Sequence, residues 1–280
     1  MLNNLFKKLR EALHLQKIDT GITTQNQLLI EGYLNKHLYD NPKYLTNEYL
    51  NKYEFQAFSQ FGEDGIIREI FDRIGVTNRY FVEFGVEDGT ETNTTYLLYQ
   101  NWNGLWIDGS EKNKLKIEGS FAKSIQERKL KIVHQFITAE NIETIFKENN
   151  VPVEFDLLSI DIDRNDHHVW NAICNFNPRL VIIEYNAIFR PPTEFIVNYN
   201  SSLIWDKTSN FGASLESYCK LAEEKGYKLV ATCFAGVNAF FLKKELAEKY
   251  FQGPFTADHF FEPPKYFLYT KNGHPRKIEL

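Results

Sequence analysis

The feature that most constrains the fold of this chain is a repeated alternation of short apolar runs with helical stretches. Segments with the 3.6-residue periodicity of amphipathic helices separate five runs typical of buried strands, residues 80–85, 104–108, 130–137, 155–161 and 179–185. Strands that alternate with helices in this way predict a mostly parallel sheet. We therefore expect an α/β fold with a Rossmann-like, doubly wound sheet.

Two further apolar runs, residues 227–234 and 238–245, stand only three residues apart. This spacing predicts an antiparallel hairpin at the edge of the sheet. Residues 186–214 precede the hairpin and combine paired prolines with loose patterning, which indicates a cover over an active site rather than a scaffold element. The aromatic, locally basic residues 255–280 carry no pattern that assigns them a role.

Residues 1–55 differ from the rest, because they are polar, rich in Asn, Leu and Tyr, and interrupted by Gly21, Gly32 and Pro42. They predict helices that pack on a main domain. We expect an N-terminal helical extension over 1–55 and one α/β domain over 56–280.

The first residues place one apolar stripe on a helix, made of Leu2, Leu5, Phe6, Leu9 and Leu13. The stripe favours docking, or a homo-oligomer formed through this helix. Attachment to a membrane surface is the alternative, because basic residues lie opposite the stripe. No apolar run approaches the ~20 residues of a transmembrane helix, and no signal-peptide cleavage pattern is present, so we expect a soluble or peripheral protein.

Composition narrows the function classes. The 280 residues are 43% hydrophobic, which suffices for a sizeable core, and their net charge of -5 gives no global attraction to nucleic acid. Three scattered cysteines without CxxC spacing argue against a disulfide framework and a structural zinc site. They favour reduced thiols and a cytoplasmic location.

A ligand-binding pattern lies at the first strand-to-helix turn, where Glu83, Gly85 and Gly89 follow the E-x-G-x-x-x-G spacing. Glycines at such a turn let the backbone approach a ligand closely. Asp108 ends the next strand about 20 residues further on, where an acidic side chain can accept hydrogen bonds from ribose hydroxyls. A turn aspartate before Gly109 is the alternative for Asp108.

The charge of this loop discriminates between nucleoside cofactors. Besides Glu83, the loop carries Glu87, Asp88 and Glu91. These carboxylates would repel the pyrophosphate of a dinucleotide, whereas they would attract a ligand with an ammonium and a sulfonium group. Stabilisation of a helix N-terminus is a sufficient alternative reason for acids here.

The motifs at residues 80–94, 104–110 and 155–163 resemble those of the class I S-adenosylmethionine-dependent methyltransferases. The resemblance covers roughly residues 55–245, and within it the chain is similar to a bacterial branch of FkbM-like and sugar O-methyltransferases. It implies an S-adenosylmethionine-dependent O-methyltransferase that methylates a sugar hydroxyl in surface-polysaccharide (capsule) or related glycan biosynthesis. The acceptor would be a small-molecule or nucleotide-linked sugar.

The resemblance also assigns roles to individual residues. It places Glu83, Gly85 and Gly89 at the methionine part, Asp108 at the ribose, Gly109 and Ser110 on the adenosine side, Thr138 near the adenine, and Gln60 in a stretch that closes over the cofactor; Asp161 is counted with the cofactor residues as well. For Gln60, a helix-capping role of its neighbourhood is the alternative.

Hard oxygen ligands cluster after the fourth and fifth predicted strands, whose carboxyl ends face one crevice. Magnesium takes one or two carboxylates plus substrate oxygens and water. The resemblance implies Asp161, Glu184 and Asn186 as the ligands. Tyr185 separates Glu184 from Asn186, where the commoner pattern has an adjacent pair.

Methyl transfer to an alcohol needs a base or a metal, because the oxygen attacks well only as its proton leaves. His168 is the favoured base, Asp163 is the alternative, and His167 is the third candidate. The two histidines face different directions on a helix, so at most one would enter the cleft. A capping or surface role is the alternative for them, and Asp166 is the preferred helix cap.

The predicted cover offers Arg190, Tyr199, Trp205 and Asp206 to an acceptor. Aromatic faces suit a sugar ring, and an arginine suits the phosphate of a nucleotide-linked sugar. Ordinary packing is the alternative, favoured for Trp205. Two other functions compete: an NAD(P)-dependent sugar oxidoreductase, which the absence of G-x-G-x-x-G disfavours, and a non-catalytic binding module with a methyltransferase fold.

Overall fold

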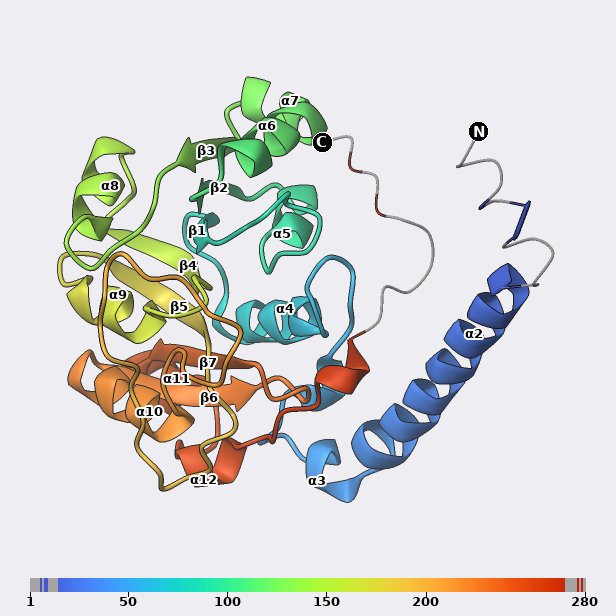
Figure 1. The fold of residues 1–280 in the computed structure, drawn as a ribbon. Coiled ribbons are helices and arrows are strands. Elements are labelled where there is room, and N and C mark those ends of the chain that lie inside the picture. Colours follow the sequence, from blue (N-terminus) through green and yellow to red (C-terminus); the bar gives the residue numbers. More distant parts are fainter. Residues whose placement is uncertain (1–5, 7, 10–14, 270–275, 277, 279–280) are drawn as a thin grey trace. The chain divides into compact units, whose positions relative to one another are not determined.

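The computed structural model describes residues 6, 8–9, 15–269, 276 and 278 (Figure 1). The chain divides into two compact units, Met1–Thr46 and Asn47–Leu280. The first contains helix α2 (Leu15–Leu34), a π-helical turn (Asn35–Tyr39) and α3 (Pro42–Leu45). Of the predicted N-terminal stripe, Phe6 and Leu9 are exposed, while Leu2, Leu5 and Leu13 lie outside the described residues.

The second unit is built on a seven-stranded sheet with the order β3-β2-β1-β4-β5-β7-β6. The strands are β1 (Tyr80–Phe84), β2 (Asn103–Asp108), β3 (Leu130–His134), β4 (Glu154–Ile160), β5 (Asn177–Glu184), β6 (Tyr227–Thr232) and β7 (Asn238–Lys243). The first five are parallel, and β7 is antiparallel to β5 and β6. The predicted α/β fold with an antiparallel C-terminal hairpin is confirmed, and β7, the second strand of the hairpin, is the one that joins β5.

Helices connect these strands and extend past them. They are α4 (Glu63–Ile74), α5 (Thr95–Tyr99), α6 (Glu111–Ser120), α7 (Ala122–Gln126), α8 (Ile142–Glu148), α9 (Asp166–Ala172), α10 (Leu215–Glu224), α11 (Lys244–Tyr250) and α12 (Ala257–Phe260), with 3-10 turns at Asn51–Tyr53 and Tyr266–Leu268. Helices α6 and α7 had no predicted counterpart. Within the described ranges, no helix combines the length and apolar character that a bilayer crossing requires.

The core consists of two apolar layers, one on each face of the sheet. Side chains alternate along β1, so that Val82 and Phe84 belong to one layer and Phe81 to the other. Helices α8, α9 and α10 contribute to the first layer, and α4, α5, α6 and α11 contribute to the second. Helices therefore cover both faces, which confirms the doubly wound arrangement (Figure 1).

The strand order positions the candidate site. From β1 the chain proceeds outward through β2 to β3, and from β4 it proceeds through β5 in the opposite direction. In open α/β sheets, ligands bind outside the carboxyl ends of the strands where the order reverses in this way. The neighbouring ends of β1 and β4 are therefore where a ligand site is expected.

Candidate functional site

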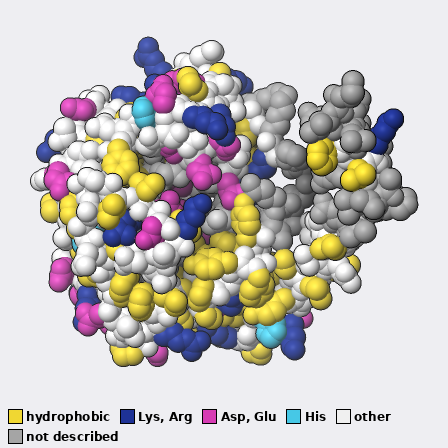
Figure 2. All heavy atoms as spheres, in the orientation of Figure 1, with side chains coloured by type: hydrophobic (Ala, Val, Ile, Leu, Met, Phe, Trp, Pro, Cys, Tyr) yellow, Lys and Arg dark blue, Asp and Glu magenta, His cyan; other side chains and the backbone are white. Residues whose placement is uncertain are grey.

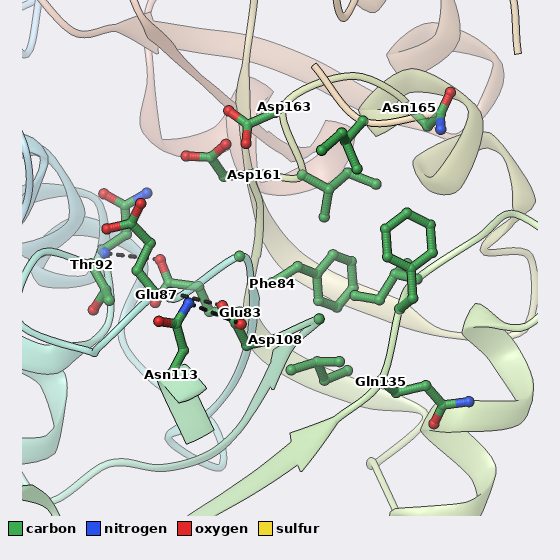
Figure 3. A pocket seen from close by; sticks show the side chains of 18 of the residues that line it. Glu83, Phe84, Glu87, Thr92, Asp108, Asn113, Gln135, Asp161, Asp163 and Asn165 are labelled. Atoms are coloured by element: carbon green, nitrogen blue, oxygen red, sulfur yellow. Dashed lines mark hydrogen bonds between the residues drawn. The ribbon is translucent and has the colours of Figure 1, made fainter. Parts of the chain in front are cut away.

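A cavity of about 420 Å³ opens at the carboxyl ends of the first four strands (Figure 3). Its walls come from the ends of β1, β2 and β4, from residues 135–137 after β3, and from the segment 186–214, which we call the cover segment. Acidic side chains gather near the centre of the face drawn in Figure 2. The cavity lies at the reversal of the strand order and is the candidate functional site.

Half of the predicted site residues line this cavity. They are Gln60, Glu83, Gly85, Asp108, Gly109, Asp161 and Asp163. The remaining predicted residues, Gly89, Ser110, Thr138, His167, His168, Glu184 and Asn186, are described but are not among the lining residues. Their contacts show what each of them does instead.

Glu83 shapes the loop that follows β1. Its carboxylate accepts hydrogen bonds from the backbone N–H groups of Asn93 and Thr94, from the Thr94 hydroxyl at 2.5 Å and from the Ser159 hydroxyl at 3.1 Å. The side chain is buried, and burial raises the pKa of Glu83 to about 7, although the hydrogen bonds oppose the shift. Glu83 thus holds Asn93 at the wall of the cavity.

Gly85 allows the ends of β1 and β4 to approach each other. Its φ is +67°, and an added Cβ would lie 1.8 Å from the Asp161 backbone oxygen. Glycine is therefore required both by the left-handed backbone conformation and by the space available. This close approach brings Asp161 to the cavity.

Asp108 lies at the end of β2, where the sequence predicted a ribose-binding carboxylate. It is 6% exposed, and it accepts hydrogen bonds from Glu87 N at 2.9 Å, Ser110 N at 2.8 Å and Asn113 Nδ2 at 3.2 Å. These bonds order the β1 loop and the start of α6 around the same wall. Asn113 and the Asp108 carboxylate both face the cavity (Figure 3).

Three of the predicted cofactor residues have structural contacts of their own. Gly89 has a φ of +77°, and a Cβ there would lie 2.7 Å from the ring of Trp106, so packing requires this glycine. Ser110 caps α6 by accepting a hydrogen bond from Asn113 N at 3.4 Å. Thr138 donates its N–H to Asn141 Oδ1 at 2.9 Å, just after the lining residues 135–137.

An acidic cluster, Asp161, Asp163 and Glu184, occupies the β4 and β5 side. One carboxyl oxygen from each residue lies within 4.8 Å of the other two. The Asp161 side chain is exposed to solvent in the cavity, but protein atoms surround it closely. Desolvation by these atoms is the main reason that the pKa of Asp161 is raised well above the usual range, and the charges of Asp166 and Asp163 add to the shift. Burial and then Asp161 raise the pKa of Glu184 in the same way.

Asn186, the third predicted metal ligand, uses its side chain otherwise. Its Nδ2 donates to the carbonyl oxygens of Ser209 at 2.8 Å and Phe211 at 3.0 Å, and its Oδ1 accepts from Ile188 N at 3.4 Å. The amide therefore holds the cover segment. Asp163 completes the oxygen cluster in its place, and three carboxylates fit the hard-oxygen preference of a divalent cation.

The histidines of α9 lie outside the cavity lining. His168 donates its Nε2–H to the Val197 carbonyl at 2.7 Å, which attaches the cover segment to α9. Burial lowers the pKa of His167 to about 4, and its Nδ1 has no partner among the residues that the structure describes. Asp166 accepts a hydrogen bond from Ile162 N at 2.8 Å and closes the turn between them, but it is the first residue of α9. The N-cap position is Asn165, which makes no side-chain capping bond, so the predicted capping role of Asp166 is wrong.

The cover segment is held mainly through its main chain. Besides Asn186 and His168, Asn165 donates to the Asn200 carbonyl at 3.0 Å and Arg164 Nη1 donates to the Asn210 carbonyl at 3.0 Å. Three of the donors, Arg164, Asn165 and His168, lie in the loop and helix that follow β4. Asn186 is the first residue of the cover segment, two residues after the end of β5. The cover is therefore fixed to the elements that carry the acidic cluster.

The four cover residues predicted to contact an acceptor make contacts with other parts of the protein instead. Trp205 Nε1 donates to the Thr208 carbonyl at 2.7 Å, the Tyr199 hydroxyl donates to Glu140, Asp206 accepts from Thr208 N and the Arg190 guanidinium lies 5.9 Å from the Phe261 ring centre. None of the four is among the lining residues. Leu203 and Ile204 line the cavity from this segment instead, and both are exposed.

The ionisable side chains of the lining are all acidic. They are Glu83, Glu87, Glu91, Asp108, Asp161 and Asp163, and no Lys, Arg or His is among the described residues that line the cavity. Burial, followed by neighbouring carboxylates, also raises the pKa of Glu87. The site is therefore suited to a positively charged or hydrogen-donating ligand rather than to an anion.

Sequence reasoning missed several lining residues, among them Phe84, Asn93, Asn113, Gln135, Phe136, Ile137 and Asn165. For residues 135–137 a signal existed, because they follow the carboxyl end of a parallel strand next to β2. Asn113 carried a weaker one, since it follows the strand-ending Asp108 by five residues. Asn238, which lines the cavity from β7, had no local signal.

Comparisons with known proteins accord with this fold. No protein-family model and no curated protein matches the chain at a significant level. Among solved structures, it is similar to an S-adenosylmethionine-dependent methyltransferase from Clostridium acetobutylicum, with 14% identity over 64% of this chain and 90% of that one and a TM-score of 0.41. A glycopeptide N-methyltransferase complexed with S-adenosylmethionine matches with 12% identity over 64% and 86% and a TM-score of 0.39.

An O-methyltransferase family protein from Burkholderia thailandensis matches with 7% identity over 65% of this chain and 58% of that one, at a TM-score of 0.40. These structural neighbours are methyltransferases that act on different acceptor atoms.

Proposed function

We propose that this protein is an S-adenosylmethionine-dependent methyltransferase of the FkbM-like, sugar O-methyltransferase kind. The observation that carries the proposal is the charge of the cavity: six carboxylates and no basic side chain among its described lining residues, at the point where the strand order reverses. S-adenosylmethionine has an ammonium and a sulfonium, which this lining attracts, against a single carboxylate and no phosphate, so its net charge is positive.

Different walls of the cavity would bind the nucleoside and the methionine part of S-adenosylmethionine. Asp108 and Asn113 would receive the ribose, and the apolar side chains of Phe136 and Ile137 would cover the adenine. The methionine part would lie along Gly85, which lines the cavity where the ends of β1 and β4 approach each other. Gln60 lines the cavity from the segment before α4 and would close this end.

The bound S-adenosylmethionine supplies an electron-poor methyl carbon: the acceptor oxygen forms a bond to it with a lone pair, the carbon–sulfur bond breaks with its pair remaining on sulfur, and the hydroxyl proton leaves. Among the candidate bases, Asp163 is the one that lines the cavity, and burial raises its pKa, which makes it a stronger proton acceptor. Asp163 is therefore proposed as the base. His168 is not proposed as the base, because its ring donates a hydrogen bond to the Val197 carbonyl of the cover segment.

The acidic cluster also fits Mg²⁺, which would be held by Asp161, Asp163 and Glu184. A divalent cation there would offset the repulsion among the three carboxylates and would acidify the acceptor hydroxyl. Proton removal by Asp163 and acidification by a metal predict different responses to a chelator.

The acceptor is proposed to be a sugar hydroxyl in surface-polysaccharide or related glycan biosynthesis. Carboxylates suit hydroxyl donors, and Leu203 and Ile204 offer an apolar face to the ring. Action in the cytoplasm agrees with the three free cysteines. A homo-oligomer formed through the N-terminal helix, and the extension over residues 1–55, remain predictions.

The competing functions meet specific obstacles. In an NAD(P)-dependent oxidoreductase the pyrophosphate would lie beside Glu87 and Glu91 without a described basic residue in the lining. A non-catalytic module would have no use for three carboxylates held within 4.8 Å at the cost of their mutual repulsion.

The test is calorimetric titration of the full chain with S-adenosylmethionine and with NAD, each with Mg²⁺ and with a chelator. We expect saturable binding of S-adenosylmethionine alone. A preference for NAD would overturn the proposal in favour of the oxidoreductase, and the absence of binding by either ligand would favour the non-catalytic module. A methyl-transfer assay that is lost in chelator would establish the metal route.

Two substitutions separate binding from chemistry. Asp108→Asn should weaken S-adenosylmethionine binding about tenfold or more, because a charged hydrogen-bond acceptor is lost from the ribose position. Asp88→Asn is the matched control, since Asp88 lies in the same loop outside the lining. Asp161→Asn should leave binding within about threefold and reduce turnover by about 10² or more. Full activity of that variant would refute the assignment of the acidic cluster.

A further inference from the structure

The acceptor side of the cavity can be located from the strand order. Asp108, Asn113 and Gln135 belong to the β2 and β3 side, and Asp161 and Asp163 belong to the β4 side. Figure 3 shows Asp161 and Asp163 on the side of the cavity opposite to Asn113 and Gln135. If the nucleoside occupies the β2 side, as proposed above, the second substrate meets the acidic cluster and the cover segment.

Electrostatic repulsion on this side of the cavity disfavours a phosphate group. The three carboxyl groups of the acidic cluster already lie within 4.8 Å of one another. A phosphate placed near the reacting hydroxyl would add negative charge in a partly desolvated space, where like charges repel more strongly than in water. No basic side chain of the described lining offsets that repulsion. Even a Mg²⁺ ion held by the three carboxylates would leave the site with a net negative charge.

Two arginines near this side lie outside the lining of the cavity. Arg164 follows Asp163 in the chain, but it is buried; its Nη1 donates to the Asn210 carbonyl at 3.0 Å, and its Nε has no partner among the described residues. Arg190, which sequence reasoning offered to a phosphate, has its guanidinium 5.9 Å from the ring centre of Phe261 and does not line the cavity. Neither arginine is presented to an acceptor in this arrangement.

The same side suits groups that donate hydrogen bonds. Carboxylates accept from hydroxyl and ammonium groups. Asn165, which is 3% exposed and lines the cavity, has an Oδ1 without a partner among the described residues, while its Nδ2 is used by the Asn200 carbonyl. Leu203 and Ile204 add exposed aliphatic surface, which can cover the apolar face of a sugar ring.

We propose that the acceptor is a sugar without a nucleotide, neutral or amine-bearing, with no phosphate next to the reacting hydroxyl. The inference rests on the methyltransferase function proposed above. It narrows the acceptor class, because a nucleoside diphosphate sugar would carry two phosphates into the acidic side of the cavity.

The first test is calorimetry on the full chain saturated with S-adenosylhomocysteine, titrated with UDP, GDP, dTDP and CDP in the presence of Mg²⁺ and again in chelator. We expect no saturable binding up to millimolar concentration. Binding of any of the four, with or without Mg²⁺, overturns the inference while leaving the methyltransferase function intact. Failure of S-adenosylhomocysteine itself to bind counts against the function, so the two failures are distinguishable.

The second test follows the methyl group. The protein is incubated with methyl-labelled S-adenosylmethionine and a glycan and small-molecule extract of its own cells, and the labelled product is passed over an anion exchanger. We expect the label to pass through unretained. Retained label that phosphodiesterase releases would overturn the inference. Absence of any labelled product, despite binding of S-adenosylmethionine, would refute methyl transfer and the inference with it.

Matched variants tie the result to the proposed cause. Asp163→Asn removes one negative charge from the acidic cluster, and Asp258→Asn removes one from an exposed position of α12. If repulsion excludes the phosphate, Asp163→Asn should bind UDP saturably at millimolar concentration, whereas the control should not. Equal UDP affinity of the two variants would contradict the charge argument.

Discussion

Gly85 lies where the ends of β1 and β4 come closest, and it yields a prediction at the scale of one atom. Gly85→Ala combines an unfavourable φ of +67° with a Cβ 1.8 Å from the Asp161 oxygen. We expect a loss of about 2–3 kcal/mol in the free energy of unfolding and much weaker ligand binding, because the strand ends must separate.

Gly226→Ala is the control for that substitution. Gly226 also has a positive φ, +79°, but no atom lies within 4 Å of its added Cβ. It should lose only about 1 kcal/mol and bind normally. Denaturant unfolding and calorimetry measure both variants, and equal losses would show that the approach to Asp161 is not what Gly85 provides.

Individual side chains show which site residues the local sequence pattern can predict. Asp161, Asp163 and Asp108 were predicted at strand ends, and they line the cavity, because the end of a parallel strand is visible in the sequence. His168 was predicted as the base from the same kind of local pattern. Its ring instead meets the Val197 carbonyl, which is a contact that only the path of the cover segment decides.

At the scale of elements, Asn186 joins the end of β5 to the cover segment. Asn186→Ala removes the donor to the Ser209 and Phe211 carbonyls. Loss of such buried hydrogen bonds costs about 1–3 kcal/mol locally. Amide hydrogen exchange in residues 208–213 should therefore accelerate about tenfold, while exchange in β1 stays unchanged. Ser202→Ala, an exposed change in the same segment, is the control, and unaltered exchange in Asn186→Ala would contradict the tether.

Asp156 organises the opposite end of the sheet. It is fully buried in β4, accepts backbone N–H groups of Thr77, Asn78 and Arg79, and pairs with Arg179 Nη1 at 2.7 Å. Asp156→Ala should cost about 3–5 kcal/mol, because a buried cation and three donors lose their partner.

The cavity lies at the other ends of the strands, so Asp156→Ala, when folded, should bind S-adenosylmethionine with unchanged affinity. Thermal unfolding measures the expected loss of stability, and calorimetry measures the affinity for S-adenosylmethionine. Asp72→Asn, a change at an exposed position, is the control. A change in affinity without a change in stability would place Asp156 in the site.

Element prediction succeeded where a periodic apolar pattern existed and failed where it did not. All seven strands carry such a pattern. Helix α6 is charged along most of its length, and only Ile117 is buried, so its formation depends on the Ser110 cap and on packing against β2 and β3. The predicted boundary at residue 55 between extension and domain stays a prediction.

At the scale of the whole molecule, a half-buried carboxyl group makes stability depend on pH. Asn51 Nδ2 and Phe234 N both donate to Glu54 Oε1, at 2.8 and 2.7 Å, and burial raises the pKa of Glu54 to about 8. Between the usual carboxyl range and pH 8, the folded state therefore holds a proton that the unfolded state has released. Stability should fall as pH rises through this window.

Glu54→Gln mimics the protonated form and should remove this dependence. We expect similar stability at pH 4 and a variant that is more stable than the wild type by a few kcal/mol at pH 9. Denaturant unfolding across pH measures the difference, with the exposed Glu148→Gln as the control. A wild type that gains stability from pH 5 to 8 relative to Glu54→Gln would refute the assignment.

The sequence by itself determined the α/β class, the parallel strands with their antiparallel hairpin, and the acidic strand ends. It could do so because apolar periodicity and turn glycines are local properties of the chain. Tertiary structure alone decided that Asn113 and Asn165 line the cavity, that Asp163 rather than Asn186 joins Asp161 and Glu184, and that His168 holds the cover. These outcomes depend on contacts between segments distant in sequence, whose geometry no local pattern encodes.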